Sequence, residues 1–401
     1  WDLKDNSVRM RCYRDLLKTQ WLPLQTLEQK QLSALRVIVA YARSNVPWYR
    51  DKLSNTPTLI ETPAMLPILE KEQIQEFGDL LISDEFSAAE LVEARTGGST
   101  GKPLRVLFDK QTQDRRNAAQ ARSNDWAGAR LGMKQVALWG NPKIDSSLKG
   151  RLRHHLLDRM YFVDTVGFDE NSAQEFANIW LRKNAQIIFG HAHSIYLLAQ
   201  YFQRSNEQRI RPTGIISTSM SLLNRERKFI EEVFACPVTD RYGCEEVGLI
   251  ASQCEQNDGF HINTDHVLVE IVDADGKACA AGEHGEILVT DLTNRGMPLI
   301  RYRVGDTATL GKEICGCGRE SPILEKLGGR LADFLQHRNG SHVAGISLIE
   351  RTLTLAPGIG QMQVIQERID HFDINFAKTE GFKDNSLKLI GSEFKVVFGE
   401  D

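Results

Sequence analysis

The sequence predicts an α/β protein with a large domain over residues 1–328 and a small α+β domain over residues 329–401. Between about residues 92 and 241, short apolar runs alternate with longer amphipathic stretches, which favours a mainly parallel sheet covered by helices. From about 250 to 327 the helical patterns stop and turns join strand-like runs, which indicates a β-rich unit. The sequence Gly328-Gly329-Arg330 then separates this unit from the rest of the chain.

Upstream of these patterns the chain is predicted to be mostly helical. Apolar residues recur at helical spacing over Leu24–Tyr49, and Asn45-Val46-Pro47 is typical of a helix stop. The strands expected next are Leu104–Phe108, Gln135–Gly140, Gln186–Gly190, Gly214–Thr218 and Pro237–Arg241. The helices expected among them are Gln111–Leu131, Asn171–Lys183, Ile195–Arg204 and Leu223–Phe234.

The C-terminal part is predicted to be rich in strands. In the β-rich unit we expect strands at His266–Val272, Glu286–Leu292, Leu299–Arg303 and Thr307–Leu310. In the small domain we expect a helix near Ile346–Leu355 and strands near Gln361–Gln366 and Glu393–Phe398.

Composition excludes several classes of protein. A length of 401 residues suggests two to three folding units at roughly 150 residues each. Hydrophobic residues at 41% and charged residues at 25% exclude a disordered or fibrous chain. No apolar run approaches the ~18 residues of a membrane span. A net charge of −4 gives no general attraction to nucleic acid or anionic lipid, so a small phosphorylated ligand held at a local site fits better.

The cysteines and the start of the chain indicate a compartment. Seven cysteines are an odd number scattered over a long chain, which favours a reducing cytosol over a disulfide framework. The first residues, Trp1-Asp2-Leu3-Lys4, lack the apolar region of a signal peptide. We therefore expect a cytoplasmic protein, with the oligomeric state left open and a dimer among the alternatives.

The most informative stretch is glycine-rich. Residues 95–103, Arg-Thr-Gly-Gly-Ser-Thr-Gly-Lys-Pro, combine glycines, hydroxyls and one lysine. Glycines let backbone N–H groups turn toward an anion, and Lys102 adds a mobile positive charge suited to phosphate. The spacing matches neither the nucleotide-hydrolase loop nor a dinucleotide fingerprint. A polyphosphate-binding loop and a flexible surface linker are both consistent with this composition.

Four further residues form a candidate zinc site: Cys254, His261, Cys315 and Cys317. Three thiolates and one imidazole are a closed, structural ligand set for zinc. Two turns from adjacent β segments could converge on one ion, although buried cysteines also act as small hydrophobic side chains.

The loop and three later segments resemble motifs of the adenylate-forming superfamily, which includes acyl-CoA ligases, adenylation domains and luciferases. Residues 241–246, Arg-Tyr-Gly-Cys-Glu-Glu, resemble its Tyr-Gly-x-Thr-Glu segment, and residues 297–306 resemble its Tyr-Arg-x-Gly-Asp segment. Residues 329–333, Gly-Arg-Leu-Ala-Asp, resemble its Gly-Arg-x-Asp-Asp hinge. Together with Leu66–Lys71 and the Cys/His pattern, these segments are most similar to the phenylacetate–CoA ligase branch and its capsular-polysaccharide-associated relatives.

The resemblance implies a reaction and roles for residues. ATP and a carboxylic acid would form an acyl-adenylate, and the small domain would rotate before the acyl group passes to CoA, or to an amine or hydroxyl. Glu246 would bind Mg²⁺, and Glu246, Lys102 and Arg330 would be catalytic. The residues implied to bind nucleotide are Thr96, Gly97, Gly98, Ser99, Thr100, Gly101, Lys102, Tyr242, Gly243, Asp306 and Arg330. The acyl pocket is expected near Trp139, Gly140, His191, His193 and Ser219.

Three departures from the family pattern keep a rival hypothesis open. Glu245 stands where the family commonly has a hydroxyl, and Ala332 stands at the usual pivot aspartate. The segment that carries the family's catalytic lysine is expected beyond Asp401, so we expect the small domain to be incomplete here. The rival is a catalytically impaired, nucleotide-binding scaffold stiffened by zinc.

Overall fold

The computed structural model divides the chain into two compact units, which we describe separately. Unit 1 comprises Trp1–Thr96, Leu104–Trp126 and Arg241–Gly329, and unit 2 comprises Gly97–Pro103, Ala127–Asp240 and Arg330–Asp401. The predicted large domain is thus distributed over both units, and its boundary at residue 328 stays a prediction. The residues that the structure describes are 7–95, 104–140, 159–165, 168–220, 222–311, 314–328, 334–338, 342–344, 348–349, 352–353, 356–379 and 381–399.

Unit 1 begins with helices α2 (Arg9–Thr19), α3 (Leu24–Asn45) and α4 (Pro47–Lys52), followed by α5 (Lys71–Phe77). The predicted Leu24–Tyr49 helix is two helices, because Pro47 pushes Val46 into an extended conformation (φ −118°, ψ 116°) and then begins α4. Short 3₁₀ turns, η1 (Pro63–Met65), η2 (Gly78–Leu81) and η3 (Ala88–Glu90), join these helices to the strands. The buried stripe of α3 packs in one core with the β-rich part of the unit.

A hairpin and a long helix follow. Strands β1 (Val92–Arg95) and β2 (Arg105–Phe108) pair antiparallel, with Arg95 opposite Arg105, so they bracket the glycine-rich loop as a hairpin. Helix α6 (Lys110–Trp126) ends five residues before the predicted helix Gln111–Leu131 does. The chain turns at Gly128, whose φ of +75° is unsuited to an α-helix and favours glycine.

The sheet of unit 1 is antiparallel and contains the predicted β-rich unit. The end of β7 (Val238–Cys244) is followed in the sheet by β8 (Gly248–Ser252), β9 (Phe260–Ile262), β13 (Ile323–Gly328), β12 (Tyr302–Leu310), β11 (His284–Asp291) and β10 (Val267–Val272). The two strands predicted at Leu299–Arg303 and Thr307–Leu310 are one strand, β12. It begins only at Tyr302, because Arg301 adopts a left-handed conformation (φ +49°).

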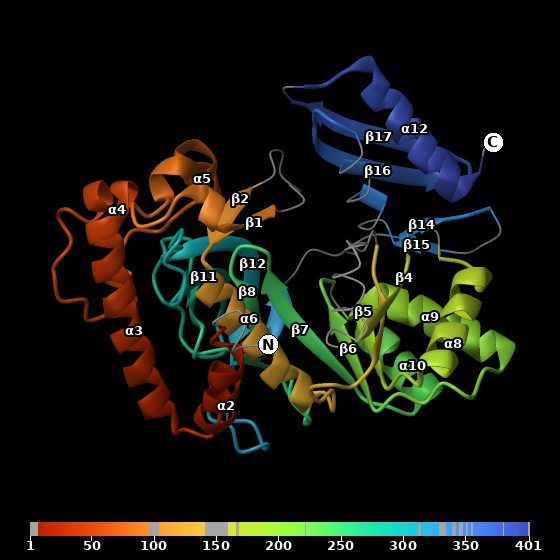
Figure 1. Cartoon of the computed structure of the whole chain (residues 1–401), viewed down its shortest axis with the longest axis horizontal. Coiled ribbons are helices and arrows are strands. Elements are labelled where there is room, and N and C mark those ends of the chain that lie inside the picture. The colour runs from red at the N-terminus through yellow and green to blue at the C-terminus, as the bar shows by residue number, and fades with distance from the viewer. Residues whose placement is uncertain are drawn as a thin grey trace. The chain divides into compact units, whose positions relative to one another are not determined.

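Unit 2 contains the predicted parallel sheet, with helices packed on one of its faces (Figure 1). Its strand order is β4 (Met160–Val163), β3 (Gln135–Leu138), β5 (Ile187–His191), β6 (Gly214–Thr218) and the beginning of β7. Helices α8 (Glu170–Lys183), α9 (Ala192–Ser205) and α10 (Asn224–Phe234) share a core with the face that carries Ile188 and Ile215. The opposite face carries Ile187 and Ile216 against Ala127 and Ala129.

The C-terminal segment is α+β, as predicted, and has its own core. It contains the strand pairs β14 (Phe334–Gln336) with β15 (His342–Ala344) and β16 (Ile359–Arg368) with β17 (His371–Lys378), then helix α12 (Asp384–Phe398). The strand predicted at Glu393–Phe398 is wrong, because this stretch is the last turns of α12. Within the described part of the chain, no helix combines the length and apolarity that a membrane span requires.

Candidate adenylation site and candidate metal centre

Two strands of unit 1 bring together the side chains predicted to bind nucleotide. Tyr242 lies near the end of β7, and its hydroxyl donates a hydrogen bond of 2.9 Å to Asp306 Oδ2 on β12. Tyr242 is half-buried, and burial together with the charge of Asp306 raises the pKa of its phenol. The phenol therefore stays protonated and holds the Asp306 carboxylate in a fixed orientation.

A β-bulge sets the position of Asp306. The register between β11 and β12 shifts between the pairs Glu286–Thr307 and Leu288–Arg303, so extra β12 residues face one residue of β11. Gly305, at the centre of this bulge, has a φ of +90° that favours glycine. The Gly-Asp pair of the sequence motif therefore has a structural reason: the glycine makes the bulge and the aspartate projects from it.

Glu246, the predicted magnesium ligand, is buried beside the same strand. The residue is 7% exposed, and its Oε1 accepts a hydrogen bond of 3.1 Å from the Tyr302 hydroxyl. Tyr302 is itself buried at the start of β12. Glu245, the residue that departs from the family motif, is exposed. The structure thus separates the two neighbouring carboxylates, one held in the interior and one on the surface.

Gly243 lies between Tyr242 and Glu246, at a close approach of two strands. A Cβ atom there would lie 2.5 Å from the carbonyl oxygen of Gly248 in β8. A side chain at this position is excluded unless the strands separate. The loop residues 96–102 and the hinge residues Arg330, Ala332 and Asp333 lie outside the described residues, so their roles stay predictions.

The residues predicted for the acyl pocket lie at the carboxyl ends of strands in the parallel sheet of unit 2. Trp139 and Gly140 follow β3, His191 ends β5, His193 is in the first turn of α9 and Ser219 follows β6. The Trp139 and His191 rings are in contact, with centroids 4.3 Å apart. Ser219 is exposed and has a left-handed backbone (φ +67°), which is uncommon for a residue other than glycine.

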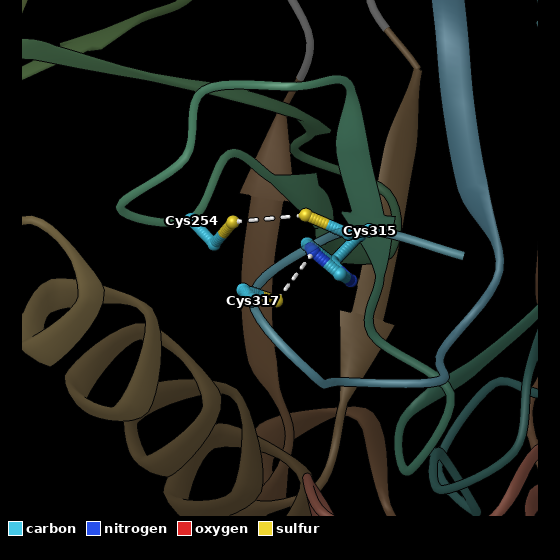
Figure 2. Close-up of side chains that lie close together, drawn as sticks. Cys254, Cys315 and Cys317 are labelled. Carbon is cyan, nitrogen blue, oxygen red and sulfur yellow. Dashed lines mark hydrogen bonds between the residues drawn. The ribbon is translucent and has the colours of Figure 1, made fainter. Parts of the chain in front are cut away.

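The four predicted zinc ligands form one cluster in unit 1. Their ligand atoms all lie within 4.8 Å of one another. The Cys254 and Cys315 Sγ atoms are 3.6 Å apart, and Cys317 Sγ is 3.5 Å from His261 Nε2. Figure 2 shows the sulfur atoms of the three cysteines turned toward a common centre. All three are free thiols.

Groups around the cluster orient the four side chains. His261 Nδ1 lies 2.9 Å from Ser321 Oγ, which leaves Nε2 directed at the sulfur atoms. Backbone N–H groups of Gln256 and Arg319 donate to Cys254 and Cys317, each at 3.4 Å. Burial raises the pKa of Cys254 to about 12, and burial lowers the pKa of His261 to about 4. Burial alone would raise the pKa of Cys317, but its hydrogen bonds, including that from Arg319, lower it. Because its pKa is lowered, the His261 imidazole is neutral and able to act as a ligand at neutral pH.

Several known proteins are similar to this chain over most of its length. Protein CapK of Staphylococcus aureus is 23% identical over 369 residues, 90% of this chain and 80% of the relative. The phenylacetate-coenzyme A ligase of Thermus thermophilus is 26% identical over 95% of this chain and 86% of its own length. That of Escherichia coli is 27% identical over 93% of this chain and 88% of its own length. No family model matches the chain.

Solved structures show the same fold. 2-Hydroxyisobutyryl-CoA ligase in its postadenylation state superposes with a TM-score of 0.64 at 19% identity, over 95% of this chain and 86% of that one. These relatives and this fold support the resemblance to the adenylate-forming superfamily that the sequence motifs indicate. The chain is similar over most of its length to phenylacetate-coenzyme A ligases and to Protein CapK, in line with the branch that the sequence motifs indicate.

Unit 1 also holds a buried network that was not predicted from the sequence. Arg116 of α6 donates to the carbonyl oxygens of Glu246 at 2.7 Å and Glu245 at 3.4 Å, and pairs with Asp291 Oδ2 at 3.1 Å. Asp291 also accepts hydrogen bonds from Thr293 and from the Asn294 backbone. Its burial would raise its pKa, but His266 and Arg116 lower it, so the carboxylate stays charged.

The signal for this network in the sequence is the spacing of small and polar residues on α6. Thr112, Arg116 and Ala119 recur at helical spacing and are all buried. An arginine at such a position predicts a buried partner, but only the fold shows that the partner is Asp291. The network fixes the backbone of the adenylate-forming motif rather than its side chains.

Proposed function

We propose that this protein activates a carboxylic acid with ATP, forming an acyl-adenylate and pyrophosphate, and then transfers the acyl group to CoA as a thioester. The single observation that carries the proposal is a pair of tyrosine–carboxylate hydrogen bonds that link β12 to β7 and to the turn after it. Tyr242 of β7 holds Asp306 of β12, and Tyr302 of β12 holds Glu246 in the turn between β7 and β8, so two carboxylates are oriented beside β12. The similarity to phenylacetate–CoA ligases over most of the chain supports this proposal.

The roles follow from the chemistry of each group. Asp306 would accept hydrogen bonds from the ribose hydroxyls, and the Tyr242 ring would lie against adenine. Glu246 offers a carboxylate to Mg²⁺, a hard cation that prefers carboxylate and phosphate oxygens. Lys102 with the glycine-rich loop, and Arg330, would neutralise the phosphates. Two anions must meet in this reaction, so neutralisation and orientation are the main contributions of the protein.

The proposal is tested by ATP–pyrophosphate exchange with the full-length protein over a panel of aryl, fatty and amino acids. We expect exchange with at least one acid and its loss in Glu246→Gln. The matched control is Glu283→Gln, on an exposed turn near β11. Mass spectrometry of the product with and without CoA separates a CoA ligase from an enzyme with an amine or hydroxyl acceptor. ATP binding without exchange on any acid would overturn the proposal in favour of a nucleotide-binding scaffold.

We further propose that the cluster of Cys254, His261, Cys315 and Cys317 holds one structural Zn²⁺. With Zn–S of about 2.3 Å and Zn–N of about 2.0–2.1 Å, a tetrahedral site requires S···S near 3.8 Å and S···N near 3.6 Å. The distances of 3.6 and 3.5 Å fit that geometry. The four protein ligands complete a tetrahedral set, so the site is structural rather than catalytic.

Metal analysis of the purified protein tests the zinc proposal. We expect about one zinc per chain, and less than half of that in Cys317→Ser. Cys279→Ser, in a turn remote from the cluster in sequence, is the matched control and should retain the metal. Protein with no stoichiometric zinc after purification without chelators would contradict the proposal.

A further inference from the structure

At the carboxyl ends of its strands, the parallel sheet in unit 2 holds buried polar atoms that are not part of the candidate nucleotide site. From β3 the chain goes to β4 on one side of the sheet, whereas from β5 it goes to β6 on the other. In open α/β sheets, ligands bind at the carboxyl ends of strands where the order reverses in this way. Trp139 follows β3 and His191 ends β5, so both lie at this point.

His191 and Ser194, at this end of the sheet, each carry a buried polar atom without a hydrogen-bond partner among the described residues. His191 is 2% exposed and Ser194 is 1% exposed. Within the residues that the structure describes, His191 Nδ1 and Ser194 Oγ are both buried and have no hydrogen-bond partner. His191 is the N-cap of α9, and no side chain caps that helix. The first turn of α9 therefore combines two unpaired side-chain atoms with the positive end of a helix dipole.

The surroundings of these atoms are aromatic. Trp139 stacks on Phe189, with centroids 5.6 Å apart and an interplanar angle of 12°, and also contacts His191. Phe189 and His191 lie on the same face of β5, two residues apart. Gly190 between them lets β3 approach closely, because a Cβ there would lie 2.8 Å from the Leu138 carbonyl oxygen. Burial lowers the pKa of His191 to about 4, so its ring is neutral at pH 7.

Buried polar atoms without hydrogen-bond partners destabilise the folded state unless a ligand pairs with them. We propose that the acyl part of the substrate carries a hydroxyl or similar hydrogen-bonding group, bound by His191 Nδ1 and Ser194 Oγ beside the Trp139 ring. This inference rests on the proposed function, because it assigns the substrate class of the same enzyme. A hydroxyl suits the site because it both donates and accepts, so it can pair with the imidazole in either tautomer. An unsubstituted hydrocarbon acid leaves both atoms unpaired.

The test compares matched acids that differ by one hydroxyl in the ATP–pyrophosphate exchange assay. The probes are phenylacetic acid with its 3- and 4-hydroxy derivatives, and isobutyric acid with 2-hydroxyisobutyric acid. We expect kcat/KM for at least one hydroxy acid to exceed that of its partner by about tenfold or more. His191→Phe, which keeps a flat ring, should reduce that preference to about twofold or less, and Ser194→Ala should weaken it. His284→Phe, on an exposed part of β11, should leave it unchanged.

The outcomes separate this inference from the function on which it rests. Exchange in which no hydroxy acid is preferred, or a preference that survives both variants, overturns the inference while the ligase activity stands. No exchange with any acid, despite ATP binding, overturns the proposed function and this inference with it. If His191→Phe fails to fold, Ser194→Ala, which removes one oxygen atom, decides the result by the same comparison.

Discussion

Replacement of Arg116 by alanine should destabilise unit 1 far more than loss of an ordinary ion pair. The Arg116 and Asp291 side chains are 6% and 0% exposed. Alanine removes the guanidinium but leaves the Asp291 carboxylate in the interior. It also removes the donors to the Glu245 and Glu246 carbonyl groups. Both the stability of the unit and the placement of Glu246 depend on this one side chain.

The magnitude follows from the burial of the pair. Removing one partner of a buried ion pair costs about 3–5 kcal/mol, because the remaining charge has no compensation. Asp291 retains its hydrogen bonds from Thr293 and Asn294, so we expect the lower end, about 3 kcal/mol. The matched control is Arg50→Ala, whose pair with Asp84 has side chains 47% and 52% exposed. An exposed pair contributes about 0–1 kcal/mol.

Urea unfolding of the wild type and both variants measures the difference. Arg116→Lys should be intermediate, because lysine keeps the charge but cannot donate to two carbonyl groups and a carboxylate in the same fork geometry. Exchange activity should fall in Arg116→Ala even under conditions in which the variant is folded, because the Glu246 backbone is no longer held. Equal losses of stability in Arg116→Ala and Arg50→Ala would refute the reasoning from burial.

Three further changes test other features. Gly243→Ala should lower the free energy of unfolding by about 1–3 kcal/mol, because its Cβ would lie 2.5 Å from the Gly248 carbonyl oxygen. The control is Gly78→Ala, where a Cβ meets nothing within 4 Å. Equal unfolding midpoints for the two variants would contradict the reasoning. Tyr302→Phe should raise the Mg²⁺ concentration needed for exchange, because Glu246 loses its hydrogen bond, and an unchanged Mg²⁺ dependence would contradict this. Lowering the pH from 6.5 to 4 should reduce the free energy of unfolding of the wild type by up to about 3 kcal/mol through His191. In this pH range the imidazole of the unfolded chain binds a proton, whereas the buried imidazole of the folded chain, with a pKa of about 4, does not. His191→Phe should lose that part of the slope, measured by urea unfolding at each pH, and a slope identical to wild type would show that His191 does not contribute.

Features that depend on local sequence were predicted well. The helix stop at Asn45-Val46-Pro47 and the strands predicted at Gly214–Thr218 and Gln186–Gly190 need only neighbouring residues, and the structure has them as the end of α3, β6 and β5. The grouping of Cys254 with Cys315 and Cys317 was also predicted, because thiols and imidazoles at two turns suggest one ion. The family motifs located Tyr242 and Asp306 on separate segments that the fold then brings together.

Features that depend on distant contacts were not predictable. The strand predicted at Glu393–Phe398 is an error of a different kind, because the helical spacing of Ile390, Phe394 and Val397 is local and becomes visible when the window is extended upstream. The bulge at Gly305 exists only because β11 pairs with β12 on both sides of it. Arg116 belongs to a helix that reads as polar, and its buried partner follows 175 residues later.

The division of unit 1 into separated stretches of sequence has a consequence for biosynthesis. Its last segment extends to Gly329, so its core cannot be completed until most of the chain has been made. At a synthesis rate of about 5–20 residues per second, the ribosome needs roughly 15–65 s to reach the end of this segment. During this time α3 leaves the ribosome with its apolar stripe uncovered, because partners such as Val267 and Ile271 are made much later. We therefore expect the nascent N-terminal helices to need shielding of their hydrophobic residues until those partners have been made.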